Sequence, residues 1–230
     1  MTRSLRAALV LAATLLPNVP VHAQDPAPAP LPLHEPIGPY VIDARGVLAR
    51  FKQNPTIAAA LGVEATDLPT RGLGLTVGAH VYPVRKRTFA LGVGGELLLR
   101  ARASHTITTE IEGPDGPIEG PEGPTVITRM TAISPQVSLN FGRRNGWSYV
   151  SGGLGRASFT SELEASPFDD PESAGSALNY GGGARWFTNK HLAVSIDLRF
   201  YAVRAQEATT ARPAFPAMTL MVFSAGVSFR

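Results

Sequence analysis

The sequence predicts an all-β protein whose eight antiparallel strands close into an up-and-down transmembrane β-barrel. Three observations predict this fold. Apolar residues recur with a period of two in eight long segments, the connections between these segments alternate between long and short, and aromatic residues gather near the segment ends. No segment has the sustained 3.6-residue apolar period of an amphipathic helix, and at most a short helical turn is expected at 56–63.

Seven of the eight segments have one apolar face and one face of small or polar residues. Segment 147–160 is so rich in glycine that its faces stay unassigned. The segments run over about 11 to 16 residues, which exceeds the typical length of about five or six in soluble strands and suffices to cross a hydrocarbon layer. They are 40–51, 72–83, 89–102, 126–141, 147–160, 177–187, 192–203 and 218–229.

Amphipathic strands of this kind fit two architectures. A soluble barrel or sandwich turns its apolar face inward, whereas an outer-membrane barrel turns that face to lipid and fills its interior with polar residues. The connections favour the second architecture, because the long ones would all lie at one end, as the outer loops of bacterial outer-membrane barrels do. The long connections are 52–70, 103–125, 161–176 and 204–217, and the short ones are 84–88, 142–146 and 188–191.

Aromatic residues near the segment ends are expected to form the rings that mark the two membrane interfaces. They are Tyr40, Phe51, Phe89, Phe141, Trp147, Tyr149, Trp186, Phe187, Phe200 and Phe229.

The N-terminal region precedes the predicted barrel domain, which spans 40–230. Two arginines, an apolar run and the small-residue signal Val21-His22-Ala23 predict a secretory signal peptide over 1–23. Residues 24–39 are proline-rich and predict a solvated, extended periplasmic linker. Removal of the signal peptide leaves 19 basic and 18 acidic residues, so no general attraction to nucleic acid is expected. The chain contains no cysteine, which excludes disulfides and thiolate chemistry.

Two C-terminal stretches resemble a known family. The stretch 179–201, NYGGGARWFTNKHLAVSIDLRFY, is similar to the penultimate hairpin of the OmpA-like and OmpX-like eight-stranded outer-membrane β-barrel proteins, and 223–230, FSAGVSFR, resembles their closing strand. The resemblance implies a monomer in the outer membrane of a Gram-negative-type cell, in contact with outer-membrane lipid and lipopolysaccharide. It also implies periplasmic chaperones and the barrel-assembly machinery as partners during biogenesis. Phe229 would be the insertion signal, displaced by one position because Arg230 ends the chain.

The interior of an eight-stranded barrel is just wide enough to be filled by side chains. Opposite charges buried there must pair, because desolvation would otherwise cost too much. The polar faces therefore predict an ion network that plugs the lumen, with a thin water channel as the alternative. Gln136 and Asn140 are further inward candidates, and no cofactor or metal centre is predicted inside. The predicted network residues are Asp43, Arg45, His80, Glu96, Arg100, Arg185, Asp197 and Arg199.

The expected function is structural or surface-interactive, covering envelope integrity and adhesion-like contacts through acidic outer loops. These loops are either simply solvated or bind divalent cations or a basic partner. One alternative is a small porin-like passive channel. Another is a lipid-modifying enzyme, for which His105 beside Ser104 is the only candidate pair and lacks a placed carboxylate, so no enzyme is expected. The acidic residues of the loops are Glu110, Glu112, Asp115, Glu119, Glu122, Glu162, Glu164, Asp169, Asp170 and Glu172.

Overall fold

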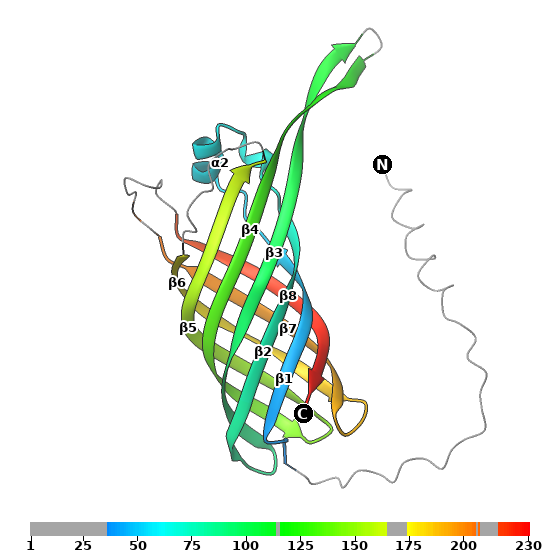
Figure 1. Cartoon of the computed structure of the whole chain (residues 1–230), viewed down its shortest axis with the longest axis vertical. Coiled ribbons are helices and arrows are strands. Elements are labelled where there is room, and N and C mark those ends of the chain that lie inside the picture. Colours follow the sequence, from blue (N-terminus) through cyan, green and yellow to red (C-terminus); the bar gives the residue numbers. More distant parts are fainter. Residues whose placement is uncertain (1–35, 114–115, 165–173, 206, 208–215) are drawn as a thin grey trace, which may run out of the picture. The chain divides into compact units, whose positions relative to one another are not determined.

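The computed structural model describes residues 36–113, 116–164, 174–205, 207 and 216–230. Eight antiparallel strands form a closed barrel in which each strand pairs with the next and the last pairs with the first (Figure 1). The all-β, eight-stranded up-and-down fold predicted from the sequence is therefore confirmed. The strands are β1 (Tyr40–Arg50), β2 (Arg71–Arg85), β3 (Phe89–Gly113), β4 (Gly116–Arg143), β5 (Gly146–Leu163), β6 (Ala174–Phe187), β7 (Leu192–Val203) and β8 (Met218–Phe229).

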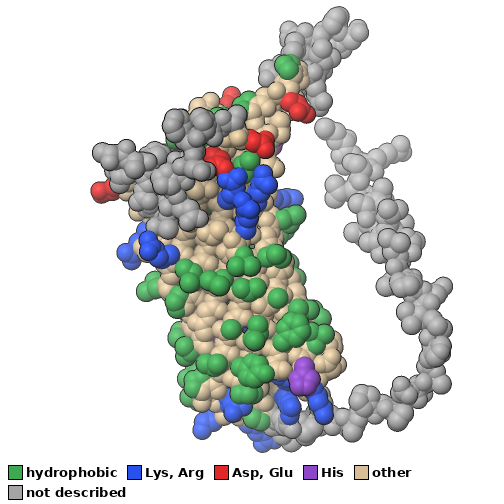
Figure 2. Space-filling view, in the orientation of Figure 1, with side chains coloured by type: hydrophobic (Ala, Val, Ile, Leu, Met, Phe, Trp, Pro, Cys, Tyr) green, Lys and Arg blue, Asp and Glu red, His purple; other side chains and the backbone are tan. Residues whose placement is uncertain are grey.

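The outer wall of the barrel is mainly apolar, and charged side chains are buried in the middle of its interior. Leu73 on β2 is 72% exposed and Leu154 on β5 is 73% exposed, whereas the charged residues Asp43 and Arg185 lie in the interior and are each 1% exposed as whole residues. Figure 2 shows hydrophobic side chains forming a broad band across the visible face of the wall. This polarity is the reverse of a soluble barrel, and it decides which face of each predicted segment points outward.

One long connection is ordered differently from the prediction. Segment 103–125 was expected to be a long connection, but β3 and β4 extend through most of it as a paired hairpin that projects beyond the neighbouring strands (Figure 1). Threonine and β-branched residues in this stretch favour the extended backbone. The pairing of Thr106 with Thr125, whose hydroxyls lie 3.0 Å apart, extends the ladder past the barrel rim.

The first long connection contains the short helix expected near 56–63. Helix α2 (Pro55–Leu61) begins after Asn54, whose side chain accepts a hydrogen bond from the Thr56 amide at 2.9 Å, and it ends at Gly62 with φ 71°. A 3₁₀ turn, η1 (Ala65–Asp67), follows. Among the described residues, no helix has the length and apolar character needed to cross a membrane.

The aromatic rings divide between the two faces of the barrel, which corrects the predicted girdle. Tyr40, Phe89, Phe141, Trp186 and Phe229 are exposed on the outer wall. Phe200 is half-buried and stacks on Tyr180 with ring centroids 5.4 Å apart. The others point into the interior. For Trp147 and Tyr149, the glycine run at 152–155 in the middle of β5 leaves no apolar face from which this phase could be read. These interior rings are Phe51, Trp147, Tyr149 and Phe187.

The two tryptophans give a test of this division. Trp186 is 52% exposed on the outer wall, and Trp147 is 3% exposed in the interior. We expect phospholipids brominated on their acyl chains to quench the fluorescence of the Trp147→Phe variant strongly, because it keeps only the outward Trp186. The Trp186→Phe variant should be quenched far less. Equal quenching of the two variants in reconstituted vesicles would contradict the assignment of faces.

Candidate functional site

The polar interior is organised around Asp43 on β1. Arg185 of β6 binds this carboxylate with two parallel hydrogen bonds of 2.9 and 2.6 Å, and Arg45 approaches it at 2.9 Å. The Ser228 hydroxyl donates a further hydrogen bond to it. These contacts join three strands, β1, β6 and β8. Asp43 therefore balances two buried guanidinium groups, and its side chain is only 2% exposed.

A second carboxylate pair lies further along the lumen. Arg199 of β7 forms hydrogen bonds of 3.1 and 3.0 Å with Asp197 and lies 3.2 Å from Glu96 of β3. Arg45 reaches the other oxygen of Glu96 at 3.4 Å, so it joins the two halves of the network. Three carboxylates and three guanidinium groups thus balance one another. Such balance satisfies the condition for burying charges in a medium of low dielectric constant.

Neutral side chains complete the network, and most of them were not predicted. The Tyr149 hydroxyl donates to Asp197 at 2.6 Å and accepts from Arg45 at 3.1 Å, and the Tyr201 hydroxyl donates to Glu96 at 3.0 Å. Tyr149 was expected in the interfacial girdle because it lies near the end of a segment, and the faces of that segment were unassigned. The period-two alternation of 192–203 places Tyr201 on the same face of the strand as Asp197 and Arg199. Ser195, Ser151 and Asn179 accept further hydrogen bonds from the arginines.

Two of the predicted network residues, His80 and Arg100, are not part of the ion network. His80 lies in the interior at 6% exposure, but neither of its ring nitrogens has a hydrogen-bond partner among the described residues. Arg100 is exposed on the outer wall, so its assignment to the interior was wrong. The β3–β4 register shifts between Leu98 and Ala101, which places Leu99 and Arg100 on the outer face in succession. A bulge of this kind inverts the alternation of all later residues in the strand.

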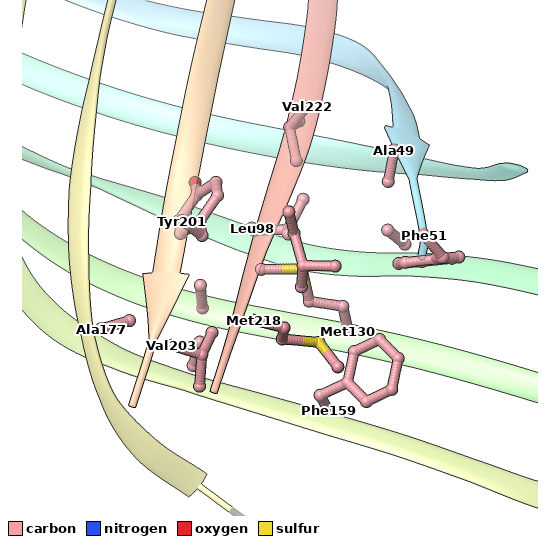
Figure 3. Close-up of a cluster of buried hydrophobic side chains, with 14 of the residues drawn as sticks. Ala49, Phe51, Leu98, Met130, Phe159, Ala177, Tyr201, Val203, Met218 and Val222 are labelled. Carbon is pink, nitrogen blue, oxygen red and sulfur yellow. The ribbon is translucent and has the colours of Figure 1, made fainter. Parts of the chain in front are cut away.

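The lumen above the ion network is apolar. This layer includes Leu98 of β3, Met130 of β4 and Phe159 of β5, and its side chains converge between the strands (Figure 3). Phe51 packs edge-on against Phe159 with ring centroids 5.7 Å apart. Ile57 of α2 packs on the same layer, so the helix covers the lumen at the end that carries the long connections, called here the long-loop end.

The opposite end, called here the short-turn end, is also filled. Ile37 is fully buried against an aromatic group that contains Tyr82, Trp147 and Phe187. The carbonyl of Pro39 accepts a hydrogen bond from the Tyr82 amide at 2.8 Å. The end of the proline-rich segment is therefore packed against the barrel, although the prediction had it solvated. Residues 1–35, which contain the predicted signal peptide and most of the linker, lie outside the described residues.

The last two residues have different surroundings. Phe229 is 45% exposed and is paired with Ile42 and Leu192. The Arg230 guanidinium stacks on the Phe187 ring at 3.8 Å and donates hydrogen bonds to the Lys190 carbonyl, at 2.7 Å, and to the Arg144 carbonyl. Partial burial, together with the nearby Arg144, lowers the pKa of Arg230 to about 10, so the side chain stays charged at neutral pH. The final residue thus connects two short turns.

We expect Arg230→Ala to destabilise the folded barrel by about 1–2 kcal/mol, because it removes a cation–π contact and two hydrogen bonds. Urea unfolding in detergent micelles, followed by tryptophan fluorescence, measures this change. Lys190→Ala is the control, since that side chain is exposed and the Lys190 carbonyl remains. An equal loss in both variants would show that Arg230 has no particular role.

The structure gives little support to an enzyme site at Ser104 and His105 or to a metal site among the acidic loop residues. Ser104 and His105 are both exposed on β3, and no hydrogen bond to either side chain occurs within the described part of the chain. In that same part, no group of three or more His, Asp or Glu side chains could hold a metal ion. Of the acidic loop residues, Glu162 pairs with Arg129, and Glu122 and Glu164 are exposed. Asp115, Asp169, Asp170 and Glu172 lie outside the described residues, as do the side chains of Glu110, Glu112 and Glu119.

A closed barrel of eight antiparallel strands that is apolar outside and ion-paired inside has the fold of the outer-membrane β-barrel proteins. Solved structures share this fold. The outer membrane protein OprG from Pseudomonas aeruginosa matches with a TM-score of 0.50 and 10% identity over 86% of this chain and 97% of that chain.

Two further structures match less well. Ail, the attachment invasion locus protein of Yersinia pestis, has a TM-score of 0.46 and 10% identity over 83% of this chain and 96% of that chain. Neisserial surface protein A has a TM-score of 0.46 and 12% identity over 84% of this chain and 97% of that chain. No protein-family model and no curated protein sequence matches the chain. The likeness to solved structures therefore concerns the fold.

Proposed function

We propose that this protein is a non-conducting outer-membrane barrel with a structural or surface-interaction role, exported by its signal peptide. The observation that carries the proposal is the reversed polarity of the closed barrel, which suits a wall surrounded by lipid. The long-loop end would face the cell exterior, and the short-turn end would face the periplasm. Outer-membrane lipid and lipopolysaccharide would be its surroundings, and the chaperones and assembly machinery of the envelope would act on it during biogenesis.

The filled lumen supports a non-conducting barrel over a passive channel. Three successive layers occupy it, namely the aromatic group around Ile37, the ion network around Asp43, and the apolar layer covered by α2. A conducting path would have to separate buried ion pairs and displace packed rings. The surface role is supported by the β3–β4 hairpin, which extends past the rim where a partner could reach it. The adhesion-like contacts would be made by this hairpin and the acidic residues near it.

Location and conductance are tested by two experiments. After cell fractionation, the protein should be found with the outer membrane and should migrate differently in gels before and after boiling, as closed barrels do. Recovery in the soluble periplasmic fraction without a mobility shift would refute the proposal. In planar bilayers, we expect no steady stepwise conductance from the purified protein. Stable conductance steps would favour the passive channel.

A further inference from the structure

A patch of basic side chains lies on the outer wall near the long-loop end. Arg50 of β1 is paired directly with Arg71 of β2. Leu73 is the next outward residue after Arg71 on β2, and it is paired with Arg102 of β3. The bulge in β3 adds Arg100 to the outer face. Like charges on directly opposed strand positions are destabilising, so this arrangement calls for a compensating anion. The basic patch consists of Arg50, Lys52, Arg71, Arg100 and Arg102, all of which are exposed.

Among the described residues, the basic patch has no paired counter-charge. Within the described part of the chain, none of its five side chains forms an ion pair or a hydrogen bond. The neighbouring Arg129, opposite Arg102 on β4, differs because it pairs with Glu162. Figure 2 shows Lys and Arg side chains gathered between the hydrophobic band and the acidic side chains beyond it. In the outer-membrane placement proposed above, cations at this level of the wall would lie where lipid headgroups meet hydrocarbon.

A groove beside the patch combines charge with apolar surface. It has a volume of about 930 Å³ and is lined by Arg50, Lys52 and Arg71 together with outward apolar side chains. Arg50 is in register with Met221 of β8, which in turn is opposite Phe200 of β7. Leu48 and Phe223 form the next outward row within the hydrophobic band. A ligand that fits this groove carries anionic groups at one end and hydrocarbon at the other.

We propose that the groove and the basic patch bind the phosphorylated lipid A part of lipopolysaccharide. Its phosphates would lie against Arg50, Lys52 and Arg71, with Arg102 within the same patch, and an acyl chain would lie along Met221 and Phe200. Arginine binds phosphate through paired hydrogen bonds, and apolar rows bind hydrocarbon. A soluble polyanion would leave the apolar rows unused. A phospholipid with one phosphate would match only part of the patch. The proposal rests on the outer-membrane placement given above.

The test is a binding titration of the full-length, detergent-solubilised protein, read by native mass spectrometry. The probes are bisphosphorylated lipid A, lipid A stripped of both phosphates, and phosphatidylglycerol. We expect the wild-type protein to bind bisphosphorylated lipid A at least about tenfold more tightly than either of the other two, since charge-assisted contacts are lost with the phosphates. Equal affinity for the stripped lipid would overturn the proposal, and so would equal affinity for phosphatidylglycerol.

A matched pair of variants locates the site. Arg50→Gln/Arg71→Gln/Arg102→Gln should weaken binding of bisphosphorylated lipid A by about tenfold or more. The control is the triple variant Arg85→Gln/Lys86→Gln/Lys190→Gln, which removes three exposed cations at the short-turn end. This variant should bind bisphosphorylated lipid A as tightly as the wild-type protein does. Equal weakening in both, or in neither, would overturn the proposal. The heat-dependent gel shift verifies folding, and the single Arg71→Gln variant serves if the triple variant does not fold. Because binding in detergent does not depend on where the protein lies in the cell, a failure to bind lipid A can be distinguished from a failure of the proposed function.

Discussion

Replacing Asp43 with alanine should destabilise the barrel by about 3–5 kcal/mol, the cost expected when one partner of a buried ion pair is removed. Asp43 is the carboxylate that binds Arg185 through two hydrogen bonds and also contacts Arg45. Without it, the interior holds three arginines against two carboxylates. The Arg185 guanidinium would keep its position over the Tyr149 ring, 4.1 Å from its centroid, but would have no carboxylate of its own. Urea unfolding of the protein in short-chain lipid vesicles measures the loss.

The double variant Asp43→Asn/Arg185→Met separates loss of charge balance from loss of packing. It restores equal numbers of buried positive and negative groups, because Arg45 and Arg199 still face Glu96 and Asp197. Since paired charges can often be replaced together at little cost, we expect it to recover at least about half of the lost stability. Glu122→Gln, at an exposed position, is the control for removing a carboxylate. A double variant no more stable than Asp43→Ala would contradict the role assigned to charge balance.

Replacing Gly153 with alanine should destabilise the barrel by about 3 kcal/mol, at the upper end of what overpacking costs. A Cβ atom at Gly153 would lie 1.8 Å from the Pro135 carbonyl oxygen and 3.1 Å from the Cα of Gln136. Both atoms belong to the backbone of β4, so no side-chain rotation can relieve the overlap. The two strands would have to separate beside Pro135, which has no amide hydrogen to donate to the ladder.

The adjacent glycine is a matched control for this substitution. A Cβ atom at Gly152 would meet its nearest heavy atom, the Asn179 carbonyl oxygen, at 3.5 Å, an ordinary van der Waals contact. Gly152→Ala should therefore change stability by less than about 1 kcal/mol, since it mainly restricts the unfolded chain. Both variants are compared by urea unfolding and by the temperature at which the gel shift is lost. Similar stability of the two variants would show that the strands do not approach each other closely at Gly153.

Much of the barrel and part of its interior could be predicted from the sequence. The alternation of Leu192, Val194 and Ile196 with Ser195 and Asp197 is local, so it needs no knowledge of neighbouring strands. The lengths of the connections are local as well, and they indicated which face of the wall meets lipid. The interior positions of Asp43, Arg185 and Arg199 follow from their phase in such strands, because side chains alternate strictly between faces.

The interior of β5 could not be predicted in this way. The run from Gly152 to Gly155 has one side chain, Leu154, and gives no readable apolar face. Tyr149 was expected at the membrane interface from its place near a segment end, and no assigned face could correct this, although Tyr149 joins Arg45 to Asp197 inside the barrel. Its position depends on hydrogen-bonded neighbours on β4 and β6, which the segment itself does not encode.

The sequence by itself determined the number, direction and polarity of the strands, because period and connection length are properties of short stretches. Only the tertiary structure decided where the alternation breaks and what closes the ends. The bulge that turns Arg100 outward arises from the pairing of β3 with both of its neighbours. The burial of Ile37 depends on rings brought together by distant strands. Register and packing are relations between strands, so they are settled when the barrel closes.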